Sequence, residues 1–349
     1  MNVQATVGER TAKDYASDQE VRWCPGCGDY AILKAMQKTL ADLQADPAAT
    51  VFVSGIGCAA RFPYYLSTYG FHTIHGRAPA VATGIKLANP ELDVWVVTGD
   101  GDALSIGGNH LIHTLRRNVD LQLLLFNNQI YGLTKGQYSP TSRAGTRSPS
   151  TPGGSLDAPL SAGALALGAG ARFYARAVDT QQKRLPGVLK RARAHQGTSF
   201  VEIFQNCIVY NDKVFGDFTE REVAATHQAH LEHGEPIRFG ETGEKGLRLN
   251  PGTLELEVAD VEAAEAAEAA EVQLLVHDET NRVLAQLLAA MEPPQFPVAL
   301  GVLYCDPAPS YERQVESEIA AACKERPNAD LNALLRSGTT WTKENGKAD

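Results

Sequence analysis

Two stretches of the chain decide the fold: Asp93-Val-Trp-Val-Val-Thr-Gly-Asp-Gly-Asp102 and Leu121-Gln-Leu-Leu-Leu-Phe-Asn-Asn128. Each begins with a short apolar run and ends in polar residues, which is typical of a strand buried on both faces of a sheet. Between them, residues 109–117 have the apolar spacing of a helix. A strand, a glycine-rich turn, a helix and a second strand predict an α/β fold with a parallel sheet flanked by helices.

The same alternation extends to both sides of these stretches. The sequence predicts two further strands, at 50–54 and 199–204, and helices at 29–43, 78–88, 160–168, 181–195 and 274–291. Residues 139–157 are rich in Ser, Thr, Pro and Gly and predict a long loop, and loops of this length are often functional.

The pattern divides the chain into three predicted parts. Residues 1–20 are expected to form a polar N-terminal arm, and residues 21–215 the main domain. The pattern weakens after about residue 210, so residues 216–349 are expected to be an extension that packs on the domain or on a partner. Within it, residues 262–271 predict a solvated Glu/Ala helix and residues 326–349 a polar arm.

Composition narrows the classes of protein. The 349 residues are 44% hydrophobic and 21% charged, which fits a soluble globular protein. The net charge of −9 argues against a nucleic-acid partner. No apolar run approaches the roughly 20 residues of a membrane helix, and the first 19 residues lack an apolar export segment. We therefore expect a cytoplasmic protein without a membrane partner.

Polar side chains follow both strands at the points where they end. Asp100 follows the first strand and Asn128 the second, and ligands of parallel sheets bind beyond the carboxyl ends of the strands. One carboxylate and one amide oxygen suit Mg²⁺, which keeps coordination positions for phosphate oxygens and water. The flanking glycines let the backbone approach a diphosphate. The structural alternative is two tight turns.

The cysteines form a second constellation. Cys24-Pro-Gly-Cys27 is a C-x₂-C turn, while Cys58 and Cys207 each follow a predicted strand. Four thiolates hold either zinc or an iron–sulfur cluster, and one C-x₂-C turn with two isolated cysteines favours a cluster built across the fold. The alternative is a tight turn with two buried thiols. Cys305 and Cys323 lack a partner motif and are predicted to be buried thiols.

Histidines at helical spacing have a simpler interpretation. His110 and His113 are three residues apart, as are His227, His230 and His233. Such spacing places side chains on one helix face and is sometimes used for metal binding. We interpret both groups as residues of solvated helices.

The Gly-Asp-Gly…Asn-Asn pattern resembles the thiamine diphosphate motif, and the resemblance implies that Asp100, Asn128 and the carbonyl of Ile130 bind Mg²⁺. Four longer motifs resemble the β subunit of 2-oxoacid:ferredoxin oxidoreductases, most closely those that use 2-oxoglutarate. They lie at residues 23–30, 55–58, 75–86 and 133–142, within a resemblance that covers residues 14–215. The resemblance implies a thiamine diphosphate-binding fold of the diphosphate type.

The resemblance also implies the residues of the site. One 4Fe–4S cluster would be bound by Cys24, Cys27, Cys58 and Cys207. The thiamine site would be lined by Ile56, Gly57, Cys58, Ala59 and His75, with Gly101, Asp102, Gly132 and Leu133 around the diphosphate. The resemblance makes His75 a catalytic candidate. Lys135 is a second candidate from its position in the loop just past the metal site, where it would meet a substrate carboxylate unless it is an ordinary surface lysine.

The implied activity is oxidative decarboxylation of 2-oxoglutarate with coenzyme A, giving succinyl-CoA and CO₂, with electrons passed to ferredoxin and the reverse reaction fixing CO₂. The chain has no second thiamine-type domain that we can identify, so an α subunit in an (αβ)₂ heterotetramer is expected to supply the activating glutamate and the coenzyme A site. Pyruvate and branched-chain 2-oxoacids are alternative substrates. Two other classes stay open: a non-redox thiamine decarboxylase or synthase with a structural zinc, and a ferredoxin-like electron carrier.

Overall fold

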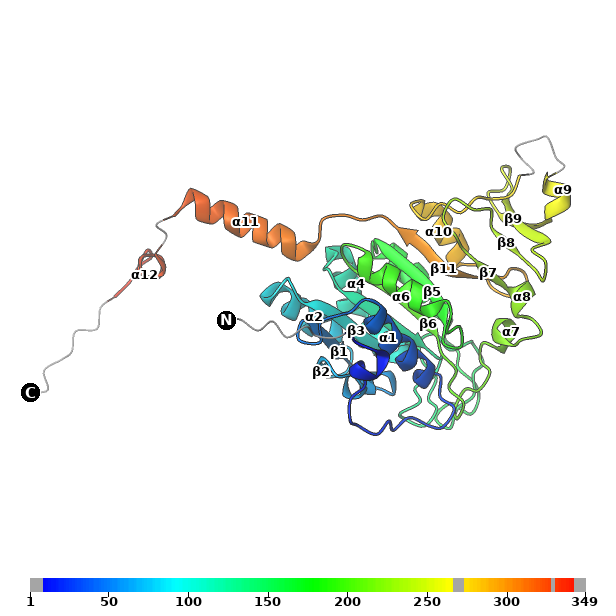
Figure 1. Ribbon diagram of the computed structural model, residues 1–349, viewed down its shortest axis with the longest axis horizontal. Helices are drawn as coiled ribbons and strands as arrows, with labels where there is room; N and C mark the ends of the chain where they lie inside the picture. The colour runs from blue at the N-terminus through cyan, green and yellow to red at the C-terminus, as the bar shows by residue number, and fades with distance from the viewer. Residues whose placement is uncertain (1–8, 266–272, 328–329, 342–349) are drawn as a thin grey trace, which may run out of the picture.

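The computed structural model describes residues 9–265, 273–327 and 330–341, without the side chains of Ala263 and Glu265. Its centre is an eight-stranded sheet in the order β2-β1-β3-β4-β6-β5-β11-β7 (Figure 1). Neighbouring strands are parallel from β2 to β5, β11 is antiparallel to β5, and β7 is parallel to β11. The strands are β1 (Thr50–Ser54), β2 (Tyr69–His72), β3 (Asp93–Gly99), β4 (Gln122–Asn127), β5 (Phe173–Val178), β6 (Ser199–Phe204), β7 (Gln228–His230) and β11 (Val298–Cys305).

The predicted parallel sheet is confirmed, and so are the four predicted strands, which are β1, β3, β4 and β6. Strands β4 and β6 are buried at every residue, as expected for a sheet covered on both faces. Strand β5 was not predicted. Its apolar pattern is broken by Arg176, which is buried because it forms an ion pair with Glu202 of β6 and a hydrogen bond with Tyr174.

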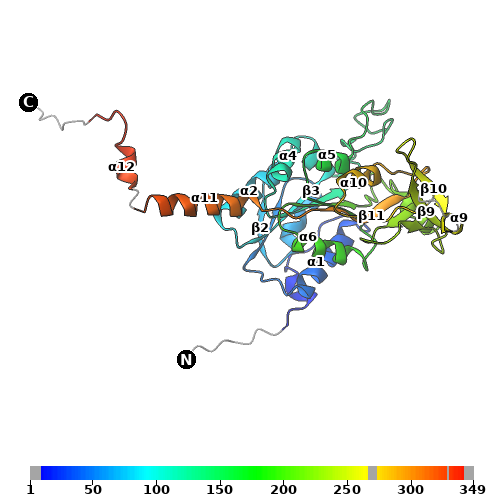
Figure 2. The ribbon, with the colours of Figure 1, turned by 90° about the horizontal axis from the view of Figure 1, so that it is seen from above.

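Helices cover both faces of the sheet (Figure 2). Helices α1 (Asp29–Asp42) and α6 (Leu185–Ala194), with the 3₁₀ segment η2 (Ala59–Tyr65), pack on one face around Met36, Phe62 and Trp95. The other face carries α2 (Ala78–Ala88), α4 (Gly108–Arg117), α5 (Ala162–Gly168) and α10 (Arg282–Ala289). Each of these helices falls within or close to a predicted one.

The N-terminal segment packs against the body of the molecule. Residues 12–15 form the 3₁₀ helix η1 (Ala12–Tyr15), and the Tyr15 side chain is fully buried. The Tyr15 hydroxyl donates a hydrogen bond to the Ala45 carbonyl at 2.6 Å. The predicted polar arm is therefore anchored from residue 12 onwards, and its first eight residues lie outside the described part of the chain.

Residues after 215 add to the main sheet and also form a small second one. They include α7 (Gly216–Thr219), α8 (Ala224–His227) and a three-stranded sheet of β8 (Arg238–Phe239), β9 (Lys245–Leu249) and β10 (Leu256–Asp260). Strands β7 and β11 join the main sheet, so the extension packs on the domain. Helices α11 (Tyr311–Glu325) and α12 (Leu331–Leu335) run away from the body (Figure 1).

One prediction for the extension is wrong in its bounds, and another is described only in part. The helix predicted at 274–291 is limited to α10, because Asn281 caps it by accepting hydrogen bonds from the Val283 and Leu284 amides. The predicted Glu/Ala helix is helical in its described part, as α9 (Val261–Glu265), and residues 266–271 lie outside the described residues.

The predictions for the histidines at 227–233 and for Cys305 and Cys323 are also wrong. His227 ends α8, His230 lies in β7 and His233 lies beyond it, so these histidines do not share a helix face. Cys323 is exposed on α11 and Cys305 is only partly buried, because β11 and α11 carry them towards the surface. Among the described residues, no helix combines the length and apolarity needed to cross a bilayer.

Candidate functional site

Four adjacent parallel strands, β1, β3, β4 and β6, end at one edge of the sheet, which we call the carboxyl edge. Gly99 of β3 pairs with Phe126 of β4, and Asn127 pairs with Phe204 of β6. The residues that follow these strands therefore meet. They are Gly55 after β1, Asp100 after β3, Asn128 after β4 and Gln205 after β6.

Asp100 is the buried carboxylate of this edge. It opens the short helix α3 (Asp100–Leu104), which stands where only a turn was predicted. Its Oδ2 accepts hydrogen bonds from Ser139 Oγ and Thr141 Oγ1, both at 2.5 Å. Burial raises the pKa of Asp100, and these hydroxyls oppose that rise. No Lys, Arg or His of the described residues forms an ion pair with it, so a bound cation would supply the counter-charge.

Asn128 and Ile130 belong to a bent segment that follows β4, the strand paired with β3, which ends just before Asp100. Gln129 adopts a left-handed conformation with φ 55°, which turns the chain. Asn128 Oδ1 accepts a hydrogen bond from the Ile130 amide at 3.2 Å. Thr141 Oγ1 lies between the two strand ends, since it contacts both Asp100 and Asn127 Oδ1. The long loop predicted at 139–157 thus holds the predicted magnesium ligands in place.

Asp102 organises three segments of the site. Its Oδ1 accepts hydrogen bonds from the Ile56 amide at 3.2 Å and the Gly76 amide at 2.8 Å, and its Oδ2 accepts one from Thr98 Oγ1 at 2.7 Å. His75 Nδ1 lies 2.6 Å from Asp102 Oδ1, close enough for an ion pair but without the direction of a hydrogen bond. The Asp102 carboxylate therefore positions the neighbouring loops.

Two glycines make this close packing feasible. Gly76 has φ +70°, and a Cβ there would lie 2.5 Å from the Gly107 amide nitrogen. A Cβ on Gly101 would lie 2.1 Å from the Tyr131 ring, whose hydroxyl donates to the Gly101 carbonyl at 3.0 Å. The packing therefore requires glycine at Gly76 and at Gly101, and Gly101 is one of the residues predicted around the diphosphate.

Three of the residues predicted around thiamine and the diphosphate line one cavity. A cavity of about 550 Å³ is lined by Ile56, Gly57 and Leu133, among others. His75 is not part of that lining, and its side chain is 42% exposed. Lys135 is exposed in the turn that Gly132 begins, and its amide donates to the Gly132 carbonyl.

The four predicted cluster cysteines come from three loops that contact one another. The Cys24–Cys27 turn is closed by the Cys27 amide, and the next residue, Gly28, donates its amide to the Asn206 carbonyl at 3.1 Å. Trp23 Nε1 donates to the Cys58 carbonyl at 2.7 Å. These bonds join the turn before α1 to the loops after β1 and β6.

Burial and neighbouring charges raise the pKa of two of these thiols. Burial, then the charge of Asp29, and then Cys207 and Cys24 raise the pKa of Cys58 to about 11. Burial raises the pKa of Cys27 further, with Asp29, Cys207 and Cys58 as additional causes. All six cysteines are free. In the described part of the chain, no three His, Cys, Asp or Glu side chains are arranged to hold a metal ion, so the thiols do not form a ready-made single-ion site.

Two residues, Gly132 and Gln205, connect the metal–diphosphate residues with the cysteines. A Cβ on Gly132 would lie 3.6 Å from Cys58 Sγ and 3.7 Å from Cys207 Sγ. Gln205 accepts a hydrogen bond from Asn128 Nδ2 at 2.8 Å and donates from Nε2 to Cys27 Sγ at 3.3 Å. Sequence reasoning missed Gln205, although its position directly after a strand, as in Asn128, was the available signal.

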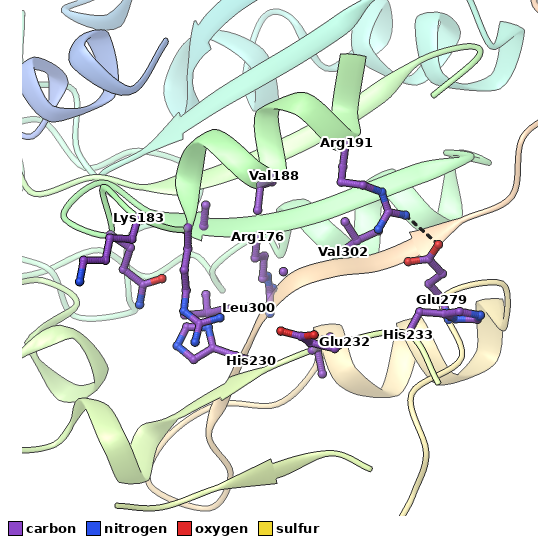
Figure 3. A pocket seen from close by; sticks show the side chains of 16 residues that line it. Arg176, Lys183, Val188, Arg191, His230, Glu232, His233, Glu279, Leu300 and Val302 are labelled. Carbon is purple, nitrogen blue, oxygen red and sulfur yellow. Dashed lines mark hydrogen bonds and ion pairs between the residues drawn. The ribbon is translucent and has the colours of Figure 1, made fainter. Parts of the chain in front are cut away.

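A separate pocket of about 400 Å³ lies between α6 and strands β7 and β11 (Figure 3). Two of its arginines form ion pairs: Arg191 contacts Glu279 at 2.7 Å, and Arg176 contacts Glu202 at 3.0 Å. None of the predicted site residues lines this pocket. The candidate site is therefore the carboxyl edge.

Comparison with known proteins supports the thiamine-type fold. Residues 55–203 match the family described as "Thiamine pyrophosphate enzyme, C-terminal TPP binding domain". The 2-oxoglutarate oxidoreductase subunit KorB of Mycobacterium tuberculosis is 48% identical over 346 residues, which is 97% of this chain and 90% of that protein. A 2-oxoacid:ferredoxin oxidoreductase β subunit of Aeropyrum pernix is 47% identical over 61% of this chain and 67% of its own length.

A solved structure is similar over nearly the whole chain. It is 2-oxoglutarate:ferredoxin oxidoreductase from Magnetococcus marinus with 2-oxoglutarate, coenzyme A and succinyl-CoA bound. The match has a TM-score of 0.75 and 31% identity, and covers 96% of this chain and 98% of the other. With these relatives and the thiamine-type fold, the chain belongs to the β-subunit family of 2-oxoacid:ferredoxin oxidoreductases, within its 2-oxoglutarate oxidoreductase members.

Proposed function

We propose that this chain, with an α subunit, converts 2-oxoglutarate and coenzyme A into succinyl-CoA and CO₂ and passes the electrons through a 4Fe–4S cluster to ferredoxin. With reduced ferredoxin the reaction runs in the direction of CO₂ fixation. The observation that carries the proposal is the contact between the two constellations, since Gly132 adjoins both Cys58 and Cys207. A redox enzyme needs its electron carrier beside the reacting centre, whereas a structural metal does not.

The residues fit Mg²⁺ and a diphosphate. Asp100 is a buried carboxylate whose partners among the described residues are two hydroxyls and backbone amides, so it lacks a counter-charge that a divalent ion would provide. We propose that Asp100, Asn128 and the Ile130 carbonyl hold the ion. This set of one carboxylate, one amide and one carbonyl leaves positions for phosphate oxygens, as Mg²⁺ prefers. Gly101, Asp102, Gly132 and Leu133 would surround the diphosphate.

The cysteines fit an iron–sulfur cluster. Cys27, Cys58 and Cys207 are partly buried thiols whose pKa is raised, so they would be protonated at neutral pH without a metal. Gln205 directs an N–H at the Cys27 sulfur, which is the kind of contact that cluster thiolates receive. We propose that Cys24, Cys27, Cys58 and Cys207 ligate one cluster. A zinc in their place is the alternative of the non-redox enzyme.

Bound thiamine diphosphate would supply the carbanion chemistry and act as the electron sink. The chain would position its reactive ring with Ile56, Gly57, Cys58 and Ala59, and Asp102 fixes this loop through the Ile56 amide. Asp102 also faces His75 Nδ1, so we propose that the other ring nitrogen, Nε2, holds or moves a proton at the substrate. Lys135 in the adjacent exposed turn is proposed to meet a substrate carboxylate.

The outermost strand of the sheet offers a docking face for the α subunit. Tyr69 and Phe71 of β2 are 63% and 47% exposed, and Ile74 just beyond the strand is 68% exposed. Exposed apolar side chains at a sheet edge close to the site are typical of an interface. The α subunit would bring the activating glutamate and the coenzyme A site, in an (αβ)₂ heterotetramer. We propose that the complex works in the cytoplasm, where free cysteines persist.

Co-purification with the α subunit followed by an assay tests the proposal. The complex is given coenzyme A, ferredoxin and, in turn, 2-oxoglutarate, pyruvate or a branched-chain 2-oxoacid, and ferredoxin reduction is followed by absorbance. We expect 2-oxoglutarate to have the highest kcat/KM. Preference for another 2-oxoacid would change the substrate, whereas CO₂ release without ferredoxin reduction would support the non-redox alternative and overturn the proposal.

A further inference from the structure

Gln205 is buried between the two constellations and is not a predicted ligand of either. Its side chain is only 1% exposed, and its backbone amide donates to the Asn127 carbonyl at 2.9 Å, which fixes it to the end of β4. A buried side-chain amide is costly unless its donors and acceptor are satisfied. The partners of Gln205 therefore define what this residue does.

The hydrogen bonds determine the orientation of two amides in series. The Ile130 amide donates to Asn128 Oδ1, so Asn128 must present its nitrogen to Gln205 Oε1. Gln205 must then direct Nε2 the other way, towards the Asn206 carbonyl at 2.6 Å and Cys27 Sγ at 3.3 Å. Rotating either amide by 180° would place donors against donors or acceptors against acceptors.

This arrangement has one consequence on each side of Gln205. Asn128 can offer a metal ion only its oxygen, because its nitrogen is held by Gln205. On the other side, an N–H directed at a cluster sulfur stabilises the reduced, more negative cluster and raises its reduction potential. One side chain thus contacts a predicted metal ligand and a predicted cluster ligand.

We propose that Gln205 is a positioning residue that couples the metal–diphosphate site to the cluster. It orients Asn128 towards the metal through Oε1, and it raises the cluster potential through Nε2. The inference rests on the proposed function, because it assigns a role to Gln205 between the two cofactors of that reaction.

Two substitutions separate the two halves of this role. In Gln205→Glu, a carboxylate oxygen still accepts from Asn128, but the other oxygen no longer donates to Cys27 and brings negative charge near the sulfur. In Gln205→Leu, both contacts are lost in a side chain of similar size. Gln228→Leu is the matched control, since Gln228 is 7% exposed, contacts Gln181 and the Phe218 carbonyl, and contacts neither constellation.

The test uses the αβ complex and two readouts besides turnover: the midpoint potential of the cluster by EPR-monitored titration, and the Kd of Mg²⁺–thiamine diphosphate. We expect a more negative midpoint potential in both variants, furthest in Gln205→Glu. We expect the Kd of Mg²⁺–thiamine diphosphate to be about ten times higher in Gln205→Leu than in the parent. In Gln205→Glu this Kd should change less than about threefold. Gln228→Leu should match the parent in both.

Folded Gln205 variants with the parental midpoint potential and Kd would overturn the inference. Parental iron and sulfide content is measured first, so the two proposals fail separately. A parent without iron overturns the proposed function together with the cluster half of this inference, and the Kd in Gln205→Leu then decides the half that concerns Asn128. If Gln205→Leu does not fold, the isosteric Gln205→Glu carries the test through the midpoint potential alone.

Discussion

The metal–diphosphate site and the cysteine group lie side by side but are built in different ways. The first places Asp100 and Asn128 directly after β3 and β4, two strands that are hydrogen-bonded to each other. The second takes its residues from three loops, before α1, after β1 and after β6, that are joined by single hydrogen bonds such as Gly28 to Asn206. The sheet therefore positions one site, and loop packing positions the other.

The difference shows how each site should respond to mutation. At the metal site the strands fix the geometry, so a change in side-chain chemistry should alter binding and leave the neighbouring site intact. At the cysteine group the proposed ligands come from three separate loops, so a change of one cysteine should affect cluster content first. Whether the two sites are independent is tested by a substitution at one site and a measurement at the other, of cofactor binding or of cluster content.

The largest effect is expected from Cys207→Ser. A hydroxyl replaces one of four proposed cluster ligands, so ferredoxin reduction by the αβ complex should fall to background while the Kd of Mg²⁺–thiamine diphosphate changes less than about threefold. Calorimetry and a ferredoxin assay check both values. Cys305→Ser is the control, because Cys305 lies on β11 beside His195. Ferredoxin reduction that survives in Cys207→Ser would mean that this cysteine is wrongly assigned.

Asp100→Asn should give the next largest effect, on cofactor binding and not on the cluster. The substitution removes the only carboxylate among the proposed magnesium ligands, so Mg²⁺–thiamine diphosphate should bind about 1000-fold more weakly, or by about 4 kcal/mol. Iron content should stay at the parental value. Asp46→Asn, at an exposed ion pair with Arg10, is the control. Equal binding in both variants would remove Asp100 from the site.

His75→Gln should have a smaller and purely kinetic effect. Loss of the imidazole that faces Asp102 should lower kcat about 100-fold without changing the Kd of Mg²⁺–thiamine diphosphate or the iron content. His113→Gln, on the surface of α4, should retain the parental kcat. A fall in cofactor affinity without a fall in kcat would show that His75 only supports the binding loop.

The smallest effect concerns His195, which contacts neither site. Burial lowers the pKa of His195 to about 4, so the folded state keeps it neutral while the unfolded chain protonates it near pH 6.5. Its stabilising contribution is present above pH 6.5 and is lost as the pH falls towards 4. In His195→Leu, the free energy of unfolding should fall by up to about 3 kcal/mol less over this pH range than in the parent. Urea unfolding at a series of pH values measures the difference. If the free energy of unfolding depends on pH in the same way in both proteins, the pKa of His195 is not lowered.

Much of this architecture could be predicted because it depends on local sequence. Strands β1, β3, β4 and β6 are short apolar runs, and the polar residues after them mark the site. Strand β5 was missed because Arg176 interrupts its apolar run, and only the packed structure supplies the Glu202 that neutralises it. Gln205 was missed for a similar reason, since its role depends on Asn128 and Cys27, which are far from it in sequence.

Cluster reduction by substrate tests the central claim most directly, because it requires both sites and their contact. The anaerobic αβ complex with Mg²⁺–thiamine diphosphate is mixed with 2-oxoglutarate without ferredoxin, and the cluster is followed by EPR and by bleaching near roughly 400 nm. We predict that substrate reduces the cluster in the parent, and that Asp100→Asn abolishes this while dithionite still reduces its cluster. A parent complex that carries zinc in place of iron, or a cluster that substrate reduces equally well in Asp100→Asn, would contradict the account.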